Sequence, residues 1–235
     1  MKTLFGYSRV LAVGDIHGMY DKLIKLMEKV QFSPEEDLLV FLGDYIDRGP
    51  DSVRCLQYVY DMKRRFPESV VCLMGNHEVM MISYFLEKKG RYHDLIGDYA
   101  VSWLENGGMK TLQELNALDS EIREELVKWV MDLPVNFRYE EFFFCHAGID
   151  SDVPLGAQNE FEMLWKRHGW REHYNGAEKI VVGHTPVQKL ESWRGKRVPK
   201  PQFLENNIIM CDTGAYMTGG RLSCVDVLSR KVWQV

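Results

Sequence analysis

The sequence repeats one pattern at six places: an apolar, strand-like run ends in Gly or another small residue, and Asp, Asn or His follows. The six runs are Val10–Val13, Leu38–Leu42, Val70–Met74, Phe142–Cys145, Ile180–Val182 and Ile208–Cys211. Short apolar runs bounded by turn residues are typical of strands buried on both faces. Core packing does not require polar residues directly beyond such strands, so the pattern indicates a polar site built at the end of a sheet.

The segments between the first three runs have helical spacing. Apolar residues recur every three or four positions at Leu23, Leu26, Met27 and Val30, and again at Val53, Leu56, Val59 and Tyr60. Strands that alternate with helices indicate a parallel sheet with right-handed crossovers. The ends of successive strands should therefore face the same edge of the sheet.

The rest of the chain divides into a helical part and a strand-rich part. Residues from about 79 to 134 carry mostly helix signals, which predicts a helical insertion, or cap, whose last helix should turn Ile122, Leu126 and Val130 inward. After Phe137, short strands joined by Gly and Pro turns continue through Arg221 to Trp233, which suggests a second, mixed sheet. We expect one α/β domain over residues 1–235.

Composition narrows the function classes. The formal net charge of -5 and pI near 5.8 argue against binding of nucleic acid or an anionic membrane, which usually shows as a basic face. The five cysteines form no CxxC motif and lie mostly in apolar runs, as in reduced cytosolic proteins. With no apolar run long enough for a signal peptide or a membrane span, we expect a cytoplasmic protein, and we expect a monomer.

The polar residues at the strand ends suggest a metal centre. They supply only oxygen and imidazole nitrogen, which suits divalent Mn, Fe or Zn in a site without thiolates. The candidates are Asp15, His17, Asp44, Asn76, His146 and His184. Asp15 and His17 are two positions apart and can close on one ion from an extended segment. One carboxylate can join two ions roughly 3.5 to 4 Å apart, the usual clamp for phosphoryl displacement, and Asp44 is our choice.

These residues lie in motifs that resemble those of a known enzyme family. The motifs are GDIHG at 14–18, GDYIDRG at 43–49, GNHE at 75–78, HAG at 146–148 and GHTP at 183–186. Together they resemble the PPP family of metal-dependent serine/threonine protein phosphatases, within the calcineurin-like metallophosphoesterases. The short chain and the CDTGA sequence at 211–215 are most similar to the bacterial and bacteriophage lambda type. The resemblance implies a two-sheet sandwich flanked by helices, with a helical cap.

The resemblance also implies a ligand set for two divalent ions, with Mn²⁺ expected first and Fe or Zn as alternatives. Asp15 and His17 would bind the first ion, Asn76, His146 and His184 the second, and Asp44 both. A hydroxide held between the ions would attack phosphorus directly, without a phosphoenzyme. The implied reaction is hydrolysis of phosphomonoesters, on a phosphoprotein or a small substrate.

The substrate-binding and acid roles follow from the same resemblance. Arg48 would bind the substrate phosphate together with Asn76, and the WKR stretch at 165–167 matches the place of a second phosphate-binding residue, Arg167. His77, oriented by Asp47, would be the general acid for the leaving alkoxide. Planar guanidinium groups suit phosphate oxygens, and a carboxylate at one imidazole nitrogen favours the charged imidazole.

Other interpretations of single residues remain open. A strand-end Asp or Asn is most often a turn or cap residue, and it is the joint occurrence that favours ligands. Asp212 is either a partner of a ligand or a structural residue. Glu78 begins a predicted helix, where a carboxylate interacts well with the dipole, so we interpret it as structural.

Three alternative functions fit the same scaffold. Dinucleoside tetraphosphate hydrolases share it, but resemblance to them would predict a residue other than Asp at 47 and Asp at 78, where this chain has Glu78. Nucleases and cyclic-nucleotide esterases often carry GHxH, where this chain has Pro186. A metal-free, non-catalytic scaffold would have lost ligands or the acid, and none is missing.

Overall fold

The computed structural model describes residues 6–85, 99–193 and 197–235, which fold into two five-stranded sheets with helices on their outer faces. The first sheet has the order β10-β9-β1-β2-β3. Its strands are β1 (Arg9–Val13), β2 (Asp37–Phe41), β3 (Val70–Cys72), β9 (Ser223–Asp226) and β10 (Val232–Gln234). β1, β2 and β3 run parallel, as predicted, with Val10 beside Leu38 and Leu39 beside Val70.

The second sheet is mixed and has the order β4-β5-β6-β8-β7. Its strands are β4 (Asn136–Tyr139), β5 (Phe142–Cys145), β6 (Lys179–Val182), β7 (Gln202–Phe203) and β8 (Ile208–Met210). β5, β6 and β8 are parallel to one another, whereas β4 and β7 pair antiparallel at the two edges. The α/β, two-sheet fold class is therefore confirmed.

One expectation about the second sheet is wrong. The segment from Arg221 to Trp233 was expected to lie in it, but β9 and β10 form an antiparallel hairpin that extends the first sheet beside β1. Without β9, one edge of β1, which is buried from Val10 to Val13, would carry unpaired backbone N–H and C=O groups, which are costly away from water. Alternation along a strand shows which residues are buried but not which sheet they join, so the sequence left this pairing undetermined.

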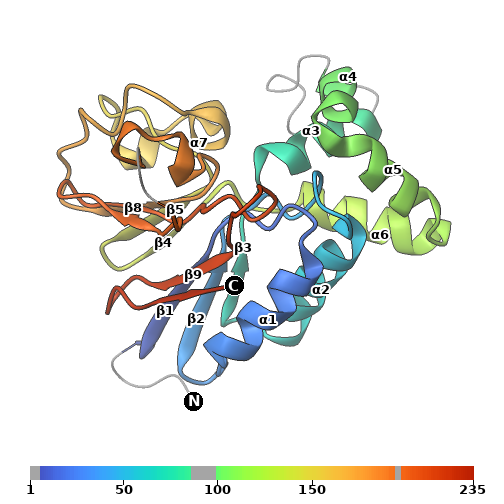
Figure 1. Cartoon of the computed structure of the whole chain (residues 1–235), viewed down its shortest axis with the longest axis horizontal. Helices are drawn as coiled ribbons and strands as arrows, with labels where there is room; N and C mark the ends of the chain where they lie inside the picture. Colours follow the sequence, from blue (N-terminus) through green and yellow to red (C-terminus); the bar gives the residue numbers. More distant parts are fainter. Residues whose placement is uncertain (1–5, 86–98, 194–196) are drawn as a thin grey trace.

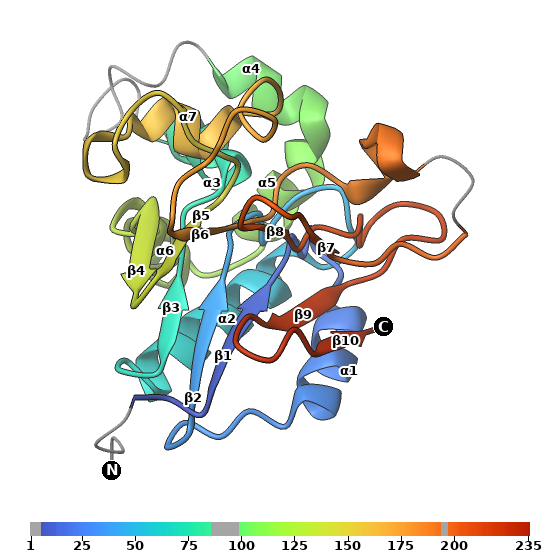
Figure 2. The same cartoon turned by 90° about the vertical axis from the view of Figure 1, so that its left-hand side faces the viewer.

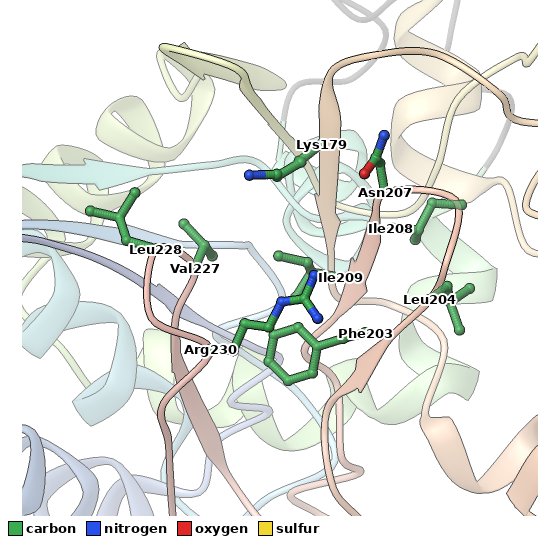
Figure 3. A pocket seen from close by; sticks show the side chains of 9 residues that line it. All are labelled: Lys179, Phe203, Leu204, Asn207, Ile208, Ile209, Val227, Leu228 and Arg230. Carbon is green, nitrogen blue, oxygen red and sulfur yellow. The ribbon is translucent and has the colours of Figure 1, made fainter.

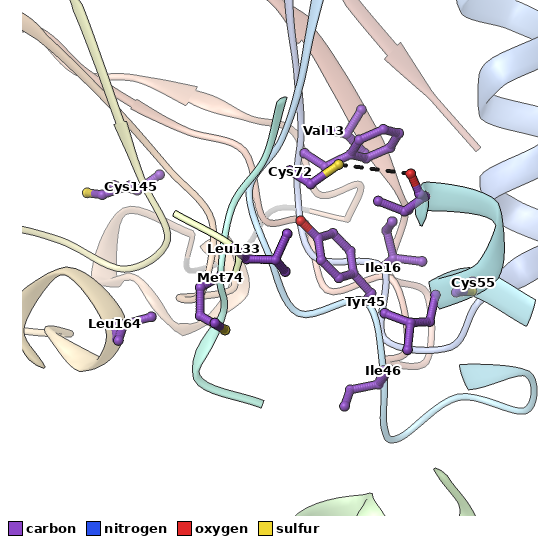
Figure 4. Packing of buried hydrophobic residues seen from close by; sticks show 14 of the residues in the cluster. Val13, Ile16, Tyr45, Ile46, Cys55, Cys72, Met74, Leu133, Cys145 and Leu164 are labelled. Carbon is purple, nitrogen blue, oxygen red and sulfur yellow. Dashed lines mark hydrogen bonds between the residues drawn. The ribbon is translucent and has the colours of Figure 1, made fainter. Parts of the chain in front are cut away.

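Side-chain alternation in the first sheet assigns each face to a different layer. Leu11, Val13, Leu39 and Phe41 belong to the cluster that contains the buried faces of the two crossover helices. These helices, α1 (Tyr20–Val30) and α2 (Ser52–Arg65), lie side by side along the first sheet (Figure 1). Figure 4 shows part of this core, where the Cys72 thiol faces the Val59 carbonyl of α2 at 4.0 Å.

The other face of the first sheet packs on the second sheet. Val10, Ala12, Leu38 and Val40 form one cluster with Phe142, Phe144, Val181 and Ile209. Two sheets that pack face to face in this way form a sandwich. At one end of this layer Phe203, Ile209, Val227 and Arg230 surround a small cavity (Figure 3).

The remaining helices lie around the sandwich (Figures 1 and 2). On one side lie α3 (Asn76–Phe85), α4 (Tyr99–Trp103), the π-turn η1 (Leu104–Gly108), α5 (Met109–Asn116) and α6 (Ser120–Met131). The second sheet carries α7 (Glu160–Trp165) and the short turns η2 (Leu155–Ala157), η3 (Val187–Lys189) and η4 (Glu191–Trp193). Helices α3, α4 and α7 lie toward the same end of the sandwich (Figures 1 and 2). None of the helices within the three described ranges is long and apolar enough to cross a membrane.

The helical segment departs from expectation at one residue. Helices α3 to α6 occupy the predicted helical part of the chain, although residues 86–98 of it lie outside the described residues. Leu126 and Val130 are buried as predicted, but Ile122 is 41% exposed. Ile122 lies in the first turn of α6, before the buried face of that helix begins at Leu126 and Val127. Helical spacing of apolar residues shows which face of a helix is apolar. It does not show how much of the length of that face a neighbouring element covers.

Candidate metal and catalytic site

All the predicted ligands lie just beyond the carboxyl ends of parallel strands. Asp15 and His17 follow β1, Asp44 follows β2 and Asn76 follows β3. His146 and His184 follow β5 and β6 of the second sheet. Because the two sheets pack face to face, both sets of strand ends contribute to one site. Each of these six side chains is almost fully buried.

The loops that carry the site residues have unusual backbone conformations. Positive φ angles occur at His17 (46°), Asp44 (52°), Asp47 (70°), Arg48 (67°) and His184 (59°). Non-glycine residues seldom adopt the left-handed region, which costs free energy and is concentrated at functional sites. Packing in the surrounding structure must compensate for this cost.

His17 and Asp44 form the first group of side chains with metal-binding potential. The Nδ1–H of His17 donates to the Ile46 carbonyl at 2.9 Å, which turns Nε2 toward the neighbouring carboxylates as the nitrogen that could bind a cation. His17 Nε2 lies 3.4 Å from Asp44 Oδ2 and 3.8 Å from Asp15 Oδ2. Asp15 Oδ1 accepts from the His184 backbone N–H at 2.8 Å, whereas its buried Oδ2 has no hydrogen-bond partner.

A second group surrounds the other oxygen of Asp44. His146 Nε2 lies 3.4 Å from Asp44 Oδ1, 3.0 Å from Asn76 Oδ1 and 3.0 Å from His184 Nδ1. His146 Nδ1 lies 2.8 Å from the Leu42 carbonyl oxygen, so Nε2 is the ring nitrogen that faces this group. Electron pairs of nitrogen and oxygen thus face one another in a buried space, an arrangement that a cation would stabilise.

The charges of these residues also suit cation binding. Burial lowers the pKa of both His17 and His184 well below the ordinary value, which keeps the imidazoles neutral as metal ligands must be. Burial, with the nearby Asp212 and Asp44 carboxylates, raises the pKa of Asp15 well above its usual range. Together with the unpartnered Asp15 Oδ2 and His184 Nε2 atoms, this cluster fits divalent cations.

His77 and Asp47 form a buried pair beside the first group. His77 Nδ1 lies 2.6 Å from Asp47 Oδ2, and His77 Nε2 lies 4.0 Å from Asp44 Oδ2. His77 is therefore also close enough to His17 and Asp44 to be a third ligand there. The bond to Asp47 occupies one ring nitrogen and turns the other toward the carboxylate of Asp44.

The helical segment supplies partners of Asp47 that the sequence did not reveal. Trp103 Nε1–H donates to Asp47 Oδ2 at 2.9 Å, and the Thr111 hydroxyl donates to Oδ1 at 2.6 Å. The backbone N–H of Asp47 donates to the Ser52 hydroxyl at 2.8 Å. Trp103 and Thr111 are 56 and 64 positions beyond Asp47 and belong to no motif, so only the tertiary structure identifies them.

Glu78 has a structural role, as expected. Its carboxylate does more than interact with the dipole of the helix that it begins. Its carboxylate accepts from the backbone N–H groups of Asp44, Tyr45 and Gly75 at 2.8, 2.8 and 3.0 Å. It thereby fastens the loop after β2 to the loop after β3. The two loops approach so closely that a Cβ atom on Gly43 would lie 2.6 Å from the Gly75 nitrogen, which requires glycine there.

Arg48 and Arg167 contact different members of the site, Arg48 in the first group and Arg167 in the second. Arg48 Nη1 donates to His17 Nε2 at 2.8 Å, and its guanidinium lies 4.7 Å from the centre of the Tyr216 ring. Tyr216 also packs edge-on against His17, and the sequence did not single it out. Arg167 Nη1 donates to the His184 carbonyl at 3.0 Å.

Asp212 follows β8 and lies in the same buried centre. Its Oδ1 accepts from the Gly214 N–H at 2.8 Å, a turn contact. Burial raises its pKa to about 6. Its charge acts on Asp15, but the structure gives it no hydrogen bond to a predicted ligand among the residues described.

Comparison with known families gives a match over most of the chain. The sequence model of the calcineurin-like phosphoesterases matches residues 8–211, a span that contains every residue of the site described above except Asp212 and Tyr216. Enzymes of this group use divalent metal ions, as the side-chain clusters suggest.

Some of the similar proteins are named as protein phosphatases and others as tetraphosphatases. The chain is 28% identical over 227 residues to serine/threonine-protein phosphatase 1 of Salmonella typhimurium, covering 92% of this chain and 91% of that protein. It is 29% identical over 206 residues to the asymmetrical bis(5'-nucleosyl)-tetraphosphatase PrpE of Halalkalibacterium halodurans, covering 75% and 78%. A crystal structure of a candidate diadenosine tetraphosphatase matches the fold with a TM-score of 0.68 and 21% identity, covering 100% of this chain and 95% of the other.

Proposed function

We propose that this chain, which belongs to the calcineurin-like phosphoesterase family, is a metal-dependent protein phosphatase that hydrolyses phosphoserine and phosphothreonine esters. The observation that carries the proposal is the buried His77–Asp47 pair at 2.6 Å beside the ligand clusters. An alkyl alkoxide is a poor leaving group, and a positioned general acid is what its departure requires.

The proposed ligand set assigns Asp15 and His17 to one cation, Asn76, His146 and His184 to the other, and Asp44 to both. The two oxygens of Asp44, each 3.4 Å from a histidine of a different group, support its bridging role. Two divalent ions bound there, Mn²⁺ by our proposal, supply Lewis acidity and neutralise charge on the phosphoryl oxygens. Fe or Zn would suit the same oxygen and imidazole ligands.

His77 is proposed to hold the proton that the leaving oxygen needs. Its Nδ1 lies 2.6 Å from Asp47 Oδ2, which fixes the ring plane, so that Nε2 is the ring nitrogen from which a proton can be donated. Trp103 and Thr111 hydrogen-bond both Asp47 oxygens and keep that carboxylate facing His77. This arrangement supports a donor role for His77 over a ligand role.

Arg48 and Arg167 are proposed to bind the phosphate together with Asn76. Their contacts with His17 and His184, one in each ligand group, support this, since an in-line displacement spreads charge over three equatorial oxygens. Arg48→Ala should then weaken inhibition by inorganic phosphate while the bound metal stays. An unchanged inhibition constant for phosphate would contradict the role of Arg48.

Hydrolysis of dinucleoside tetraphosphates is the second candidate function. Relatives named for that activity are about as similar as the phosphatase, at 29% and 30% identity. The chain spans 54% of the length of the symmetrical tetraphosphatase of Legionella pneumophila. Asp47 favours the phosphatase, because it pairs with the proposed acid, and phosphate leaving groups depart without the help that an alkoxide needs. Glu78 favours it through the motif resemblance alone.

The deciding experiment is a comparison of substrates. Purified protein is assayed with Mn²⁺ and with a chelator on phosphoserine peptides, phosphothreonine peptides, diadenosine tetraphosphate and an aryl phosphate. The proposal predicts metal-dependent turnover with the highest kcat/KM on a phosphopeptide. Higher kcat/KM on diadenosine tetraphosphate would favour the second candidate, and no metal-dependent turnover at all would contradict both.

A further inference from the structure

A large cavity opens beside the candidate site on the side of the second sheet. Its volume is about 810 Å³, and its lining includes Arg167, Arg171, Thr185 and Lys189. Arg167 is the proposed phosphate ligand, and Thr185 directly follows the proposed metal ligand His184. The cavity therefore begins where the binding site for the scissile phosphate ends.

Two buried polar groups in this wall have few or no hydrogen-bond partners. Thr185 is 3% exposed, and its hydroxyl oxygen has no hydrogen-bond partner. Arg171 is 9% exposed, and Nη1 donates to the Arg167 carbonyl at 2.6 Å. Within residues 6–85, 99–193 and 197–235, the Arg171 guanidinium forms no salt bridge, so most of its donors are free to bind a ligand.

The charges of the cavity differ between its depth and its rim. The arginines are the more enclosed charged groups, with Arg171 buried and Arg167 half-buried. Lys189 and the three glutamates of the lining, Glu172, Glu191 and Glu205, are all exposed. The lining contains three basic and three acidic residues, so its formal charges balance. Water and salt screen exposed charges far more than buried ones, so the inner part of the cavity carries a net positive charge.

From these contacts we propose that the cavity binds a second phosphate group of the substrate, with Arg171, Thr185 and Lys189 as its ligands. A guanidinium, a hydroxyl and an ammonium are donors that complement phosphate oxygens. The inference rests on the proposed phosphoester hydrolysis and adds a substrate class: esters that carry another phosphate close to the scissile one. In a phosphoprotein this is a neighbouring phosphorylated residue, and in a dinucleotide it is the remaining polyphosphate.

The backbone contacts indicate why the two phosphates would be bound together. Arg171 donates to the carbonyl of Arg167, and Arg167 donates to the carbonyl of His184. Each guanidinium therefore lies against the backbone of the next residue in this series, Arg171 against Arg167 and Arg167 against His184, and both arginines line the cavity. A substrate with two phosphates can contact both arginines, whereas one with a single phosphate reaches only Arg167.

The test compares substrates with one and two phosphates on the metal-loaded enzyme. The substrates are a peptide with one phosphoserine, the same peptide with a second phosphoserine two residues away, diadenosine tetraphosphate, and p-nitrophenyl phosphate. The variants are Lys189→Ala, Thr185→Val and Arg171→Gln. Thr185→Ser, which keeps a hydroxyl, and Lys25→Ala on the exposed face of α1 are the matched controls.

We expect Thr185→Val and Arg171→Gln to raise KM for a two-phosphate substrate about tenfold, since each removes a hydrogen bond to a charged group. Lys189→Ala should raise it about threefold, because exposed charges interact weakly. KM for the one-phosphate peptide and kcat on p-nitrophenyl phosphate should stay within about twofold, as should all constants of Thr185→Ser and Lys25→Ala. Arg171 is buried, so Arg171→Gln could fail to fold. Lys189 is exposed, so Lys189→Ala should fold and can test the proposal in that case.

The outcomes separate this inference from the proposed function. A selective loss on the doubly phosphorylated peptide supports a phosphopeptide as the source of the second phosphate, and a selective loss on diadenosine tetraphosphate supports a polyphosphate. Equal effects on one- and two-phosphate substrates, or no effect of any variant, overturn the cavity's role while activity on p-nitrophenyl phosphate persists. Absence of that activity in the wild type would instead contradict the proposed function. Calorimetric titration of the doubly phosphorylated peptide into chelator-treated protein should show the same order of variants.

Discussion

At the scale of single residues, the loop after β2 brings four different roles together within five positions. The Asp44 carboxylate faces both ligand groups, and the backbone N–H groups of Asp44 and Tyr45 donate to Glu78. Further along the loop, Asp47 pairs with His77 and Arg48 contacts His17. The left-handed conformation at Asp44, Asp47 and Arg48 turns their side chains in these separate directions. Changes at neighbouring positions should therefore have distinct effects.

The division between acid and ligand gives the first prediction. His77→Asn should lower kcat on alkyl phosphates by about 10²- to 10⁴-fold and leave the bound metal unchanged, since it removes a proton donor. Asp44→Asn should lose metal, because it removes the carboxylate shared by both groups. Metal content by atomic absorption and kcat by phosphate release measure the two effects. Equal metal loss in both variants would show that His77 is a ligand.

A second prediction concerns Glu78. Glu78→Gln replaces a carboxylate that accepts three backbone N–H groups by an amide with one acceptor oxygen. Leaving a buried donor unpaired costs about 1 to 3 kcal/mol, so the free energy of unfolding should fall by that amount. Urea titration of the metal-free protein measures it. Glu35→Gln, an exposed change on the surface, is the control, and equal stability of both variants would rule out the loop-fastening role of Glu78.

At the scale of elements, the helical segment contributes to the site through Asp47. Trp103 ends α4 and Thr111 lies in α5, and both donate to the carboxylate that orients His77. The π-turn between these helices contains Gly107 with φ of 108°, where the chain passes close to Arg48. The segment thus supports Asp47 and, through it, His77, the proposed acid.

This connection gives the third prediction. Thr111→Val keeps the side-chain shape but removes the hydroxyl that binds Asp47 and Ser52, so kcat on alkyl phosphates should fall while KM and metal content change little. Loss of one hydrogen bond to a charged group costs about 1.5 to 3 kcal/mol. If the whole cost falls on the proton transfer from His77, kcat should fall about 10- to 150-fold. Thr111→Ser should restore most of kcat. Turnover of an aryl phosphate, whose leaving group needs no acid, should be much less sensitive, and equal losses on both substrates would point to a general structural effect.

Predictions of whole elements succeeded where a local pattern was sufficient. The strands before the six polar junctions and the helices α1 and α2 follow from apolar runs and helical spacing, and the structure has them. The placement of β9 and β10 failed, because strand pairing depends on which edge is open and not on the strand's own sequence. The predicted burial of Ile122 was wrong for a related reason, since how much of a helix face is covered depends on the length of the neighbouring elements.

At the scale of the whole molecule, the site lies where two sheets meet, and its proposed metal ligands come from positions 15 to 184. Asp15 Oδ1 accepts from the His184 N–H, a contact across 169 positions that joins the first sheet to the second. Ligands from both sheets around common cations would add a further link between them. Metal binding should therefore stabilise the entire fold.

The fourth prediction is a metal-dependent melting temperature. Mn²⁺ at about 100 times its Kd should add about 2.7 kcal/mol to the free energy of unfolding. For a chain of this length that corresponds to an increase in Tm of about 5 to 10 °C. Differential scanning calorimetry with Mn²⁺ and with a chelator measures it, with Asp44→Asn expected to lose the increase and Lys25→Ala to retain it. A Tm that does not respond to Mn²⁺ in the wild type would contradict the ligand set.

The sequence by itself determined the strand ends and the chemistry placed there, because a buried strand followed by Gly and Asp, Asn or His is a local pattern. It also identified Asp44, His77 and Arg48 through motifs within a few positions. Only the tertiary structure decided what surrounds them: Trp103 and Thr111 on Asp47, Tyr216 on Arg48, and the cavity that joins Arg167 to Arg171. The physical reason is that these contacts join residues far apart in the chain, and their side chains meet only because two sheets and their flanking helices pack into one arrangement.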